Sequence, residues 1–343
     1  MIRINLALQG GGAHGAFTWG VLDRLLQEDD IEIAAISGTS AGALNGAALK
    51  AGWLLDGRDG ARENLDWLWT QVARLDDMAV PLWMQAWLPT PAAISKSIEY
   101  SPLFQLSDTV SRMMSPYAWG PLYENPLEKI VDQFDFGRVC ANEGPQLFVC
   151  ATQVRDGKVR IFEGDAITTQ SILASACLPT LFQAVKVKDP ETGIVEAFWD
   201  GGYTGNPALF PLFHAELPDD VVIVNINPLV RDTIPVMPNE IQNRINEISF
   251  NSSLLRELRA IEFVQRLISA GKMQEGVMKN VLVHMIADDA LMNDLSVATK
   301  LVPVPSVIAT LKEAGRRATG EFLAHHKADL GKRQTADLVR MFG

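Results

Sequence analysis

The sequence has few cysteines, no long apolar run and a shortage of basic residues, and each deficit excludes a class of protein. No stretch of about 20 consecutive apolar residues occurs, so no segment is expected to cross a membrane as a helix. The N-terminus lacks the apolar core and cleavage site of a secretory signal. Cys140, Cys150 and Cys177 form no CxxC pair, which indicates buried free thiols in a reducing compartment. We therefore expect a cytoplasmic protein, with any membrane contact made from the periphery.

The balance of charges limits the partners of the protein. Asp and Glu number 41 and Lys and Arg number 30, which gives a formal net charge of −11. Phosphate contacts need clustered Lys and Arg, so no nucleic-acid partner is expected. Charge alone would not hold such a protein on an anionic membrane either. Contact with lipid would therefore have to come from exposed apolar side chains.

The first 75 residues alternate between strand and helix patterns. Residues 2–8 read as a strand that enters a glycine turn, and residues 15–28 carry apolar side chains at helical spacing. Residues 31–37 form a second short strand, which an Ala-rich helix follows, and residues 58–75 read as a further helix. The order strand, helix, strand, helix predicts a mostly parallel sheet with helices on its faces.

The rest of the chain divides into an insertion, more sheet and a helical end. Residues 76–125 are rich in Pro, Met and Trp and are interpreted as a lid-like insertion, with Trp83 and Trp87 as candidates for lipid contact or for core. Strands are expected at 146–153, 158–162, 183–188, 194–199, 221–226 and 281–286, with a hairpin around Asp156-Gly157, and helices at 166–176, 239–270, 305–326 and 328–341. The long helix has an apolar stripe formed by Ile241, Ile245, Ile248, Leu255, Leu258, Ile261 and Leu267. We expect a catalytic domain over 1–230 and a helical C-terminal extension over 231–343 packed on it.

The segment Gly38-Thr39-Ser40-Ala41-Gly42 is a G-x-S-x-G pattern between an expected strand and an expected helix. A nucleophilic serine has to project from a sharp turn, and small neighbours allow the backbone to make that turn. The helix that follows directs its positive end at the hydroxyl. Ser40 is thus a candidate nucleophile, and the alternative is a tight turn with an N-capping serine.

A second glycine-rich turn, Gly10-Gly11-Gly12-Ala13-His14-Gly15, follows the first strand. Its amides could form an oxyanion hole, or they could cradle a dinucleotide, since the run also matches G-x-G-x-x-G. The dinucleotide interpretation expects an acidic residue at the end of the second strand, where this chain has Ser37-Gly38. We therefore favour an oxyanion hole built from Gly10, Gly11 and Gly12.

A serine nucleophile needs a base, and two candidates follow from the sequence. The order Ser40, Asp200, His284 is formally that of an α/β-hydrolase triad. However, Ser40 comes after only one strand and one helix, and His284 lies within an expected strand, as a buried structural histidine would. Asp200 closes a strand and precedes Gly201-Gly202, so a loop can carry it to another element.

Three patterns in this order, the glycine run at 10–15, GTSAG at 38–42 and DGG at 200–202, resemble those of the patatin-like phospholipases. The segment 171–185 is also similar to the run that precedes the aspartate in that family, and the likeness covers about residues 4–227. The resemblance implies a three-layer α/β/α fold with a mostly parallel central sheet. His14 departs from the pattern, because the family usually carries Arg or Lys there.

The resemblance also implies a chemistry. It predicts a serine acyl hydrolase that cleaves fatty-acyl esters of phospholipids or lysophospholipids through a Ser40–Asp200 dyad and an acyl-enzyme, with no metal or organic cofactor. The alternatives are a soluble-ester or thioester hydrolase of the same mechanism, a nucleotide-binding α/β protein, and a non-catalytic member that acts through its C-terminus. An oligomer formed through the C-terminal helices stays open.

Overall fold

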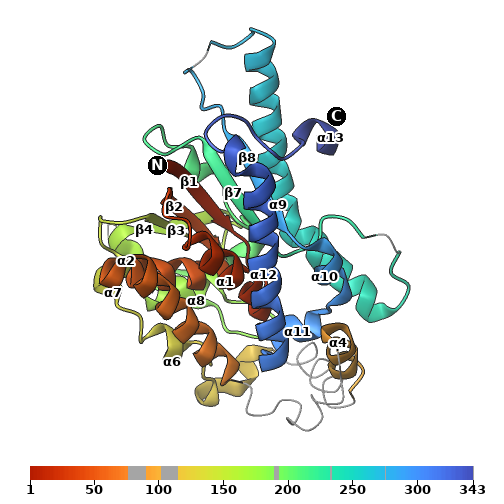
Figure 1. The fold of residues 1–343 in the computed structure, drawn as a ribbon. Coiled ribbons are helices and arrows are strands. Elements are labelled where there is room, and N and C mark those ends of the chain that lie inside the picture. The colour runs from red at the N-terminus through yellow and green to blue at the C-terminus, as the bar shows by residue number, and fades with distance from the viewer. Residues whose placement is uncertain (76–89, 102–114, 189–192, 232–233, 275, 343) are drawn as a thin grey trace.

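The structure is a computed structural model that describes residues 1–75, 90–101, 115–188, 193–231, 234–274 and 276–342. One eight-stranded sheet runs through the described part, with helices on both of its faces (Figure 1). Its strands lie in the order β5-β6-β3-β2-β1-β7-β8, and β4 pairs with β3. The expected three-layer α/β/α fold is thus confirmed.

Five neighbouring strands of the sheet are parallel, as the alternation of strands and helices predicted. They are β3 (Gln146–Gln153), β2 (Ile31–Thr39), β1 (Ile2–Leu8), β7 (Asp220–Asn225) and β8 (Leu282–Ala287). The other three strands run antiparallel to their neighbours and are β4 (Val159–Glu163), β5 (Val185–Lys188) and β6 (Val195–Asp200). The hairpin expected around Asp156-Gly157 joins β3 to β4.

The alternation of side chains along β1 serves two cores, one on each face of the sheet. Ile4, Leu6 and Leu8 pack on one face in a cluster with α1 (Gly15–Leu25), α2 (Ala41–Ala73), α8 (Thr169–Ser175) and α12 (Pro305–His326). Ala7 packs on the other face, in a cluster that includes Leu254, Leu258 and Ile261 of α9 (Pro238–Ser269). Both cores need elements from the C-terminal third of the chain.

The remaining described elements are short. They are α4 (Pro91–Glu99), α6 (Glu128–Val131), α7 (Phe136–Val139), α10 (Asp289–Asp294), α11 (Val297–Leu301) and α13 (Leu338–Phe342), with 3-10 turns at Gly12–His14, Pro116–Leu122, Gly164–Ala166, Gly201–Tyr203, Phe210–Phe213 and Lys327–Asp329. The two helices expected on either side of residue 57 are both present within α2, where non-helical backbone at Asp56 and Gly57 separates them.

One expectation about the C-terminal region is wrong. The helix expected over 328–341 is limited to α13, because Gly331 takes a φ of 74° and the N–H groups of Thr335 and Ala336 donate to the backbone oxygen of Val283. The apolar stripe expected on α9 is buried along only part of its length. Leu258 and Ile261 are in the core, whereas the isoleucines of the N-terminal half face solvent.

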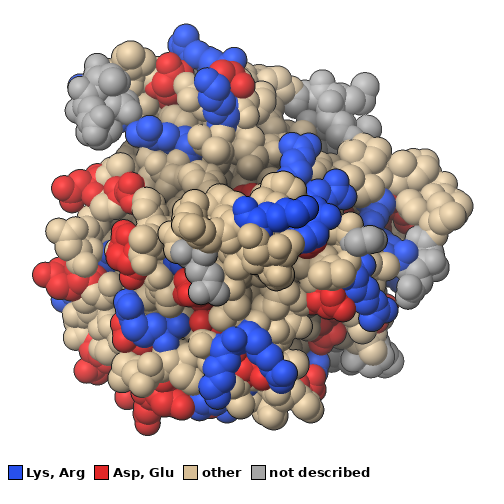
Figure 2. Space-filling model, turned by 90° about the horizontal axis from the view of Figure 1, so that it is seen from above, with Lys and Arg blue, Asp and Glu red and all other residues tan. Residues whose placement is uncertain are grey.

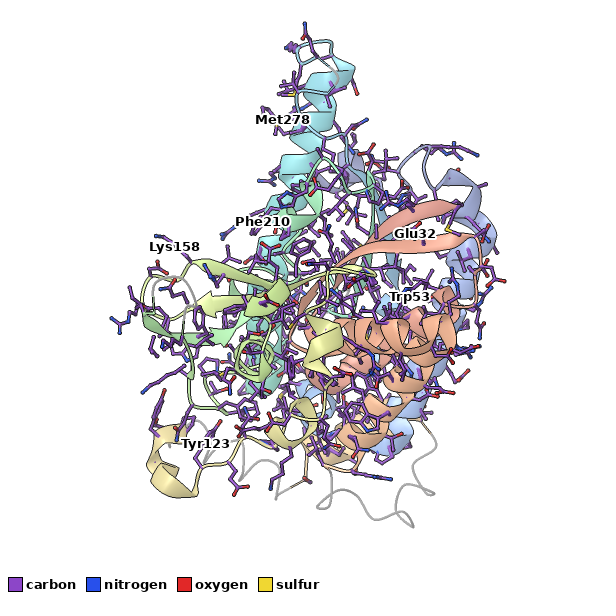
Figure 3. All side chains as sticks on the ribbon, turned by 90° about the vertical axis from the view of Figure 1, so that its left-hand side faces the viewer. Glu32, Trp53, Tyr123, Lys158, Phe210 and Met278 are labelled. Atoms are coloured by element: carbon purple, nitrogen blue, oxygen red, sulfur yellow. The ribbon has the colours of Figure 1, made fainter. Side chains whose placement is uncertain are left out.

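The two ends of α9 have different surroundings. Its C-terminal end projects past the sheet (Figure 1), and Met278, on the loop that follows, lies beside this projecting end (Figure 3). Among the described residues, no helix is both long and apolar enough to cross a membrane. Trp83 and Trp87 of the expected lid lie outside the described residues, so that expectation stays a prediction.

Candidate active site

Ser40 occupies the turn between β2 and α2. It is the one non-glycine residue with a positive φ among the described residues, at 53°, a backbone conformation that L-residues adopt at a cost. Gly42 makes the turn possible, because a Cβ there would overlap the backbone oxygen of Leu8. The Ser40 N–H donates to Ser175 Oγ at 2.9 Å, which ties the turn to α8. The strand–turn–helix setting expected for a nucleophile is present.

The register of β3 explains how Asp200 meets Ser40. β2 pairs with β3 as far as Thr39, which lies opposite Cys150. β6 pairs with β3 from the next residue onward, Asp200 opposite Ala151, while β4 occupies the other edge of β3. β6 therefore continues the edge that β2 leaves, and the ends of these two strands face each other.

The carboxyl group of Asp200 is buried and lies close to the Ser40 side chain. Gly202 N–H donates to Asp200 Oδ1 at 2.7 Å. Burial raises the pKa of Asp200 to about 7, although the Gly202 amide and the Ser40 side chain act to lower it. Such a carboxyl group can exchange a proton near neutral pH.

The glycine turn lies directly against the serine. A Cβ on Gly10 would be 2.7 Å from Ser40 Cβ, so a larger residue would collide with the candidate nucleophile. The Gly10 N–H donates to Asn206 Oδ1 at 2.6 Å. The N–H groups of Gly11 and Gly12 have no acceptor among the described residues, and both glycines line the pocket beside Ser40.

A pocket of about 190 Å³ opens over Ser40 and Asp200. Part of its wall is apolar and is formed by Leu178, Leu181, Tyr203, Phe250, Val297 and Leu301. Another part is polar and is formed by Asn227, Gln242, Asn243, Asn246, Glu247 and Lys300. The described part of the chain has no group of three or more His, Cys, Asp or Glu side chains placed to hold a metal ion.

No histidine lines this pocket within the described residues. His284 lies on β8 and is bonded to Asp220 Oδ1 at 2.9 Å and to Thr335 Oγ1 at 3.0 Å. His14 is buried behind the glycine turn with Nε2 2.9 Å from Thr299 Oγ1. Burial and the nearby charge of Lys300 hold the pKa of His14 well below its usual value. The sheet therefore brings Ser40 to Asp200 and keeps both histidines out of their contact.

Residues 6–213, more than half of the chain, match the family model of the patatin-like phospholipases. The chain belongs to this family. Its members are lipid acyl hydrolases, and all three sequence motifs that carried the resemblance lie within the matched residues.

Two solved structures are similar to this patatin-like chain. VipD from Legionella pneumophila is 16% identical over 95% of this chain and 67% of its own, with a TM-score of 0.43. The heterodimeric complex ExoU–SpcU from the type III secretion system of Pseudomonas aeruginosa contains a chain that is 16% identical over 99% of this chain and 65% of its own, with a TM-score of 0.29. The chain thus spans about two thirds of the length of each. No curated protein matches the sequence.

Several residues of this patatin-like site could not be found from sequence patterns. Gln9 accepts through Oε1 from the N–H groups of Ile226 and Asn227, and Asn227 Nδ2 donates to the Gly10 oxygen at 2.8 Å. Asn206 holds the Gly10 amide and follows the DGG motif closely, which is its one local signal. Lys300 comes from α11 and reaches the pocket only through tertiary packing.

Proposed function

We propose that this protein hydrolyses fatty-acyl esters of phospholipids or lysophospholipids, with Ser40 as nucleophile and Asp200 as its base. The observation that carries the proposal is the placement of a strained serine beside a buried aspartate in one pocket, with the pKa of the aspartate raised to about 7. A carboxylate with an ordinary pKa would be a weaker base toward a serine hydroxyl. The family of the chain supports the same class of reaction.

The reaction proceeds through an acyl-enzyme. Asp200 accepts the proton of Ser40 as Oγ attacks the ester carbonyl carbon, and the carbonyl oxygen becomes an oxyanion. We assign the free amides of Gly11 and Gly12 as its donors, while Asn206 fixes Gly10 behind them. Collapse of the intermediate breaks the ester bond, and Asp200 passes its proton to the leaving alcohol. Asp200 then takes a proton from water as the water attacks the acyl-enzyme carbonyl. Asp200 returns this proton to Ser40 Oγ as the bond to the acyl carbon breaks and the fatty acid leaves.

The outer face of α9 supports contact with a lipid surface. Ile241, Ile245 and Ile248 are 42%, 53% and 55% exposed, and they lie about half a helical turn away from Asn243 and Asn246, which line the pocket. The helix thus has its polar face toward the pocket and its apolar face toward solvent, the reverse of an ordinary surface helix. Both acidic and basic side chains are exposed on the face seen from above in Figure 2, with the acidic ones mainly toward its left and lower edges. We propose that the isoleucines meet the substrate aggregate.

A labelling experiment tests the proposed nucleophile. A fluorophosphonate probe should label the purified protein, and Ser40→Ala should abolish the label and the release of fatty acid from phosphatidylcholine and lysophosphatidylcholine. Asp200→Asn should lower hydrolysis by at least about a thousandfold, with the double variant little worse than either single variant, because the two residues act as one unit. Labelling of Ser40→Ala equal to that of the wild type would refute the proposal.

A second set of substrates separates the alternatives. Faster turnover of a soluble thioester than of phospholipid would favour a thioesterase with the same dyad. Dinucleotide binding that is lost when Gly11 is enlarged would favour a nucleotide-binding protein. His284→Gln serves as the control for a triad, since it retains a hydrogen-bonding side chain at a site bonded to Asp220, and it should leave kcat within about twofold of the wild type.

A further inference from the structure

Lys300 is the one basic residue that lines the active-site pocket within the described residues. Its side chain is partly buried, and Nζ donates to Asn227 Oδ1 at 2.9 Å. Burial lowers the pKa of Lys300 to about 8, so at neutral pH this side chain is protonated in most copies of the protein. An ammonium group placed this way usually has a carboxylate partner.

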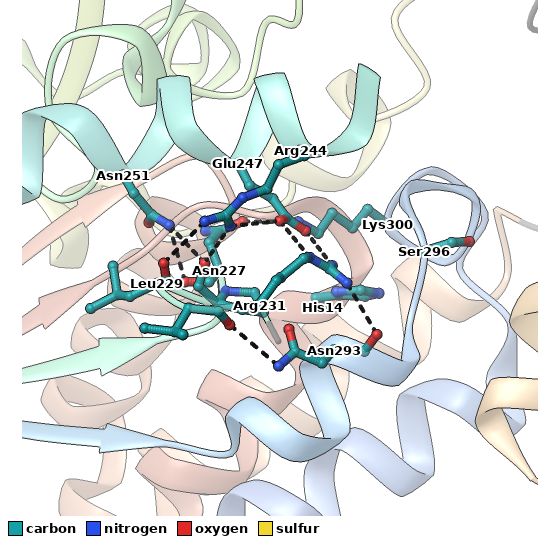
Figure 4. A network of polar contacts seen from close by, with 12 residues as sticks. His14, Asn227, Leu229, Arg231, Arg244, Glu247, Asn251, Asn293, Ser296 and Lys300 are labelled. Carbon is teal, nitrogen blue, oxygen red and sulfur yellow. Dashed lines mark hydrogen bonds and ion pairs between the residues drawn. The ribbon is translucent and has the colours of Figure 1, made fainter. Parts of the chain in front are cut away.

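No carboxylate is bonded to Lys300 among the described residues, although Glu247 lines the same pocket. The two oxygens of Glu247 are taken by Arg231, at 2.6 Å and 2.8 Å, and Arg244 adds a contact at 3.3 Å (Figure 4). The cluster of Lys300, Arg231, Arg244 and Glu247 therefore has three positive charges and one negative charge. Two further carboxylates lie nearby, the exposed Glu240 and Glu99, whose side chain interacts with Asn243 and Ser296. The cluster of Lys300, Arg231, Arg244 and Glu247 itself keeps an excess of positive charge, which favours an anionic ligand.

The glycine turn separates Lys300 from the nucleophile. Gly10 lies against Ser40, whereas a Cβ on Gly12 would overlap the backbone oxygen of Lys300. Asn227 connects the two sides, because it accepts from Lys300 and donates to the Gly10 oxygen. An anion bound by Lys300 would lie beyond the turn from the reacting carbonyl. A phosphodiester fits this arrangement, since two glycerol carbons separate the phosphate from the nearest ester of a phospholipid.

The neighbouring side chains supply further donors. Asn243 and Asn246 line the polar wall from α9, and the side chain of Asn243 interacts with Glu99. Asn246 Oδ1 accepts from Gln242 Nε2 at 3.3 Å, which leaves the Asn246 Nδ2 to donate to a ligand. We propose that Lys300, together with Asn246, binds the headgroup phosphate of a glycerophospholipid whose ester lies at Ser40. This site rests on the proposed hydrolase function and gives it a preference for phospholipids over neutral glycerides.

Matched substrates test the phosphate site. Dihexanoyl phosphatidylcholine and dihexanoylglycerol carry the same acyl chains, and both are used below the concentrations at which they aggregate. Lys300→Met should raise KM for the phospholipid at least about tenfold, as expected for a lost charged hydrogen bond, with kcat within about twofold. Turnover of dihexanoylglycerol should change less than twofold.

Two control variants accompany this test. Lys300→Arg should restore most of the phospholipid affinity. Lys272 is exposed, and Lys272→Met should behave as the wild type.

Equal losses on both substrates would overturn the phosphate site, because they would place Lys300 in oxyanion stabilisation or in the fold. An unchanged KM for the phospholipid in folded Lys300→Met would overturn it as well. Calorimetric binding of dihexanoyl phosphatidylcholine to Ser40→Ala, with and without Lys300→Met, needs no turnover. A tenfold fall in binding caused by Lys300→Met supports the phosphate site, whether or not fluorophosphonate labels the protein. Failure of fluorophosphonate to label the wild type would refute only the proposed hydrolase function.

Discussion

Burial and the neighbouring donor groups shift the pKa of Asp200 in opposite directions. Burial disfavours the carboxylate, and the donors Gly202 and Ser40 favour it, and the balance raises the pKa to about 7. The same position that makes Asp200 a useful base at neutral pH also makes its charged form costly to the fold. These two consequences can be measured separately.

The first consequence is a pH dependence of catalysis. Asp200 has to be deprotonated before it can accept the Ser40 proton, so kcat/KM for a soluble neutral ester should rise with pH and level off above about 7. Below that pH, activity should fall about tenfold for each pH unit. A profile measured from pH 5 to pH 8 tests this. A rate that stays flat down to pH 5 would rule out Asp200 as the base.

The second consequence is a pH dependence of stability. The pKa of Asp200 is higher in the folded protein than in the unfolded chain, so the native state holds a proton that the unfolded state has lost between about pH 4 and pH 7. Stability therefore falls as pH rises through this window. Asp200→Asn removes the effect and should stabilise the protein at pH 8 by up to about 4 kcal/mol, because one pKa unit corresponds to about 1.4 kcal/mol.

Urea unfolding at pH 4.5 and at pH 8 measures this difference. The gain of Asp200→Asn over the wild type should be large at pH 8 and small at pH 4.5. A gain of the same size at both pH values would mean that the asparagine improves packing, and it would leave the titration of Asp200 without support.

Sequence patterns found the residues with local signals. Ser40 and Asp200 stand in short motifs at the ends of strands, so their place in a turn and their approach could be predicted. Asn206, Asn227 and Lys300 could not, because each reaches the glycine turn through contacts across about 200 residues or more of chain. The same holds for the Gly10 amide, whose bond to Asn206 removes it from the expected set of free donors.

At the scale of elements, periodicity predicted most strands and helices of the sheet domain to within a few residues. It failed where tertiary contacts override local preference. Residues 335–336 bond to the edge of β8 and so leave the helix expected over 328–341. On α9 the period was right, but periodicity alone does not say that the N-terminal isoleucines face solvent. An apolar stripe predicts which side chains share one face of a helix, but it does not predict whether another part of the protein covers that face.

The contact between α1 and α12 depends on two glycines. A Cβ on Gly315 would overlap the backbone oxygen of Phe17, and a Cβ on Gly20 would overlap that of Lys312. Gly315→Ala should therefore lower the free energy of unfolding by about 1–3 kcal/mol through overpacking. Gly320→Ala in the same helix meets no atom within 4 Å and should raise it by up to about 1 kcal/mol. Urea denaturation of both variants tests the pair, and equal effects would contradict the close contact.

At the scale of the whole molecule, the C-terminal extension contributes to the same sheet, the same cores and the same pocket as the rest of the chain. Residues 231–343 supply β8 to the sheet, α12 to one core, α9 to the other and α11 to the pocket. We propose that the expected division at residue 230 separates segments of sequence that fold together. The family match ends at residue 213, before any of these elements.

A truncated chain tests this proposal. Residues 1–230 alone would expose the edge of β7 and the faces of both cores, so the fragment should lack a cooperative thermal transition and should bind a hydrophobic dye. The full chain should unfold in one transition. A fragment that melts cooperatively near the melting temperature of the full chain would show that 1–230 is a domain in its own right.

The outer face of α9 is proposed to bind the lipid surface that supplies the substrate. With a net charge of −11, the protein gains little from anionic lipids, and the exposed isoleucines offer apolar contact on the face of α9 opposite the one that lines the pocket. Replacing Ile241, Ile245 and Ile248 together by Gln should weaken binding to phosphatidylcholine vesicles at least about tenfold, since each buried aliphatic side chain contributes on the order of 1 kcal/mol or more. Turnover of soluble dihexanoyl phosphatidylcholine should stay within about twofold. The matched control replaces Val277 and Met278 by Gln as well. These exposed apolar residues lie beyond the other end of α9, and this variant should bind vesicles as the wild type does. Vesicle binding that survives the triple change, or a change of molar mass in light scattering instead of a loss of binding, would assign this face to another copy of the chain and not to lipid.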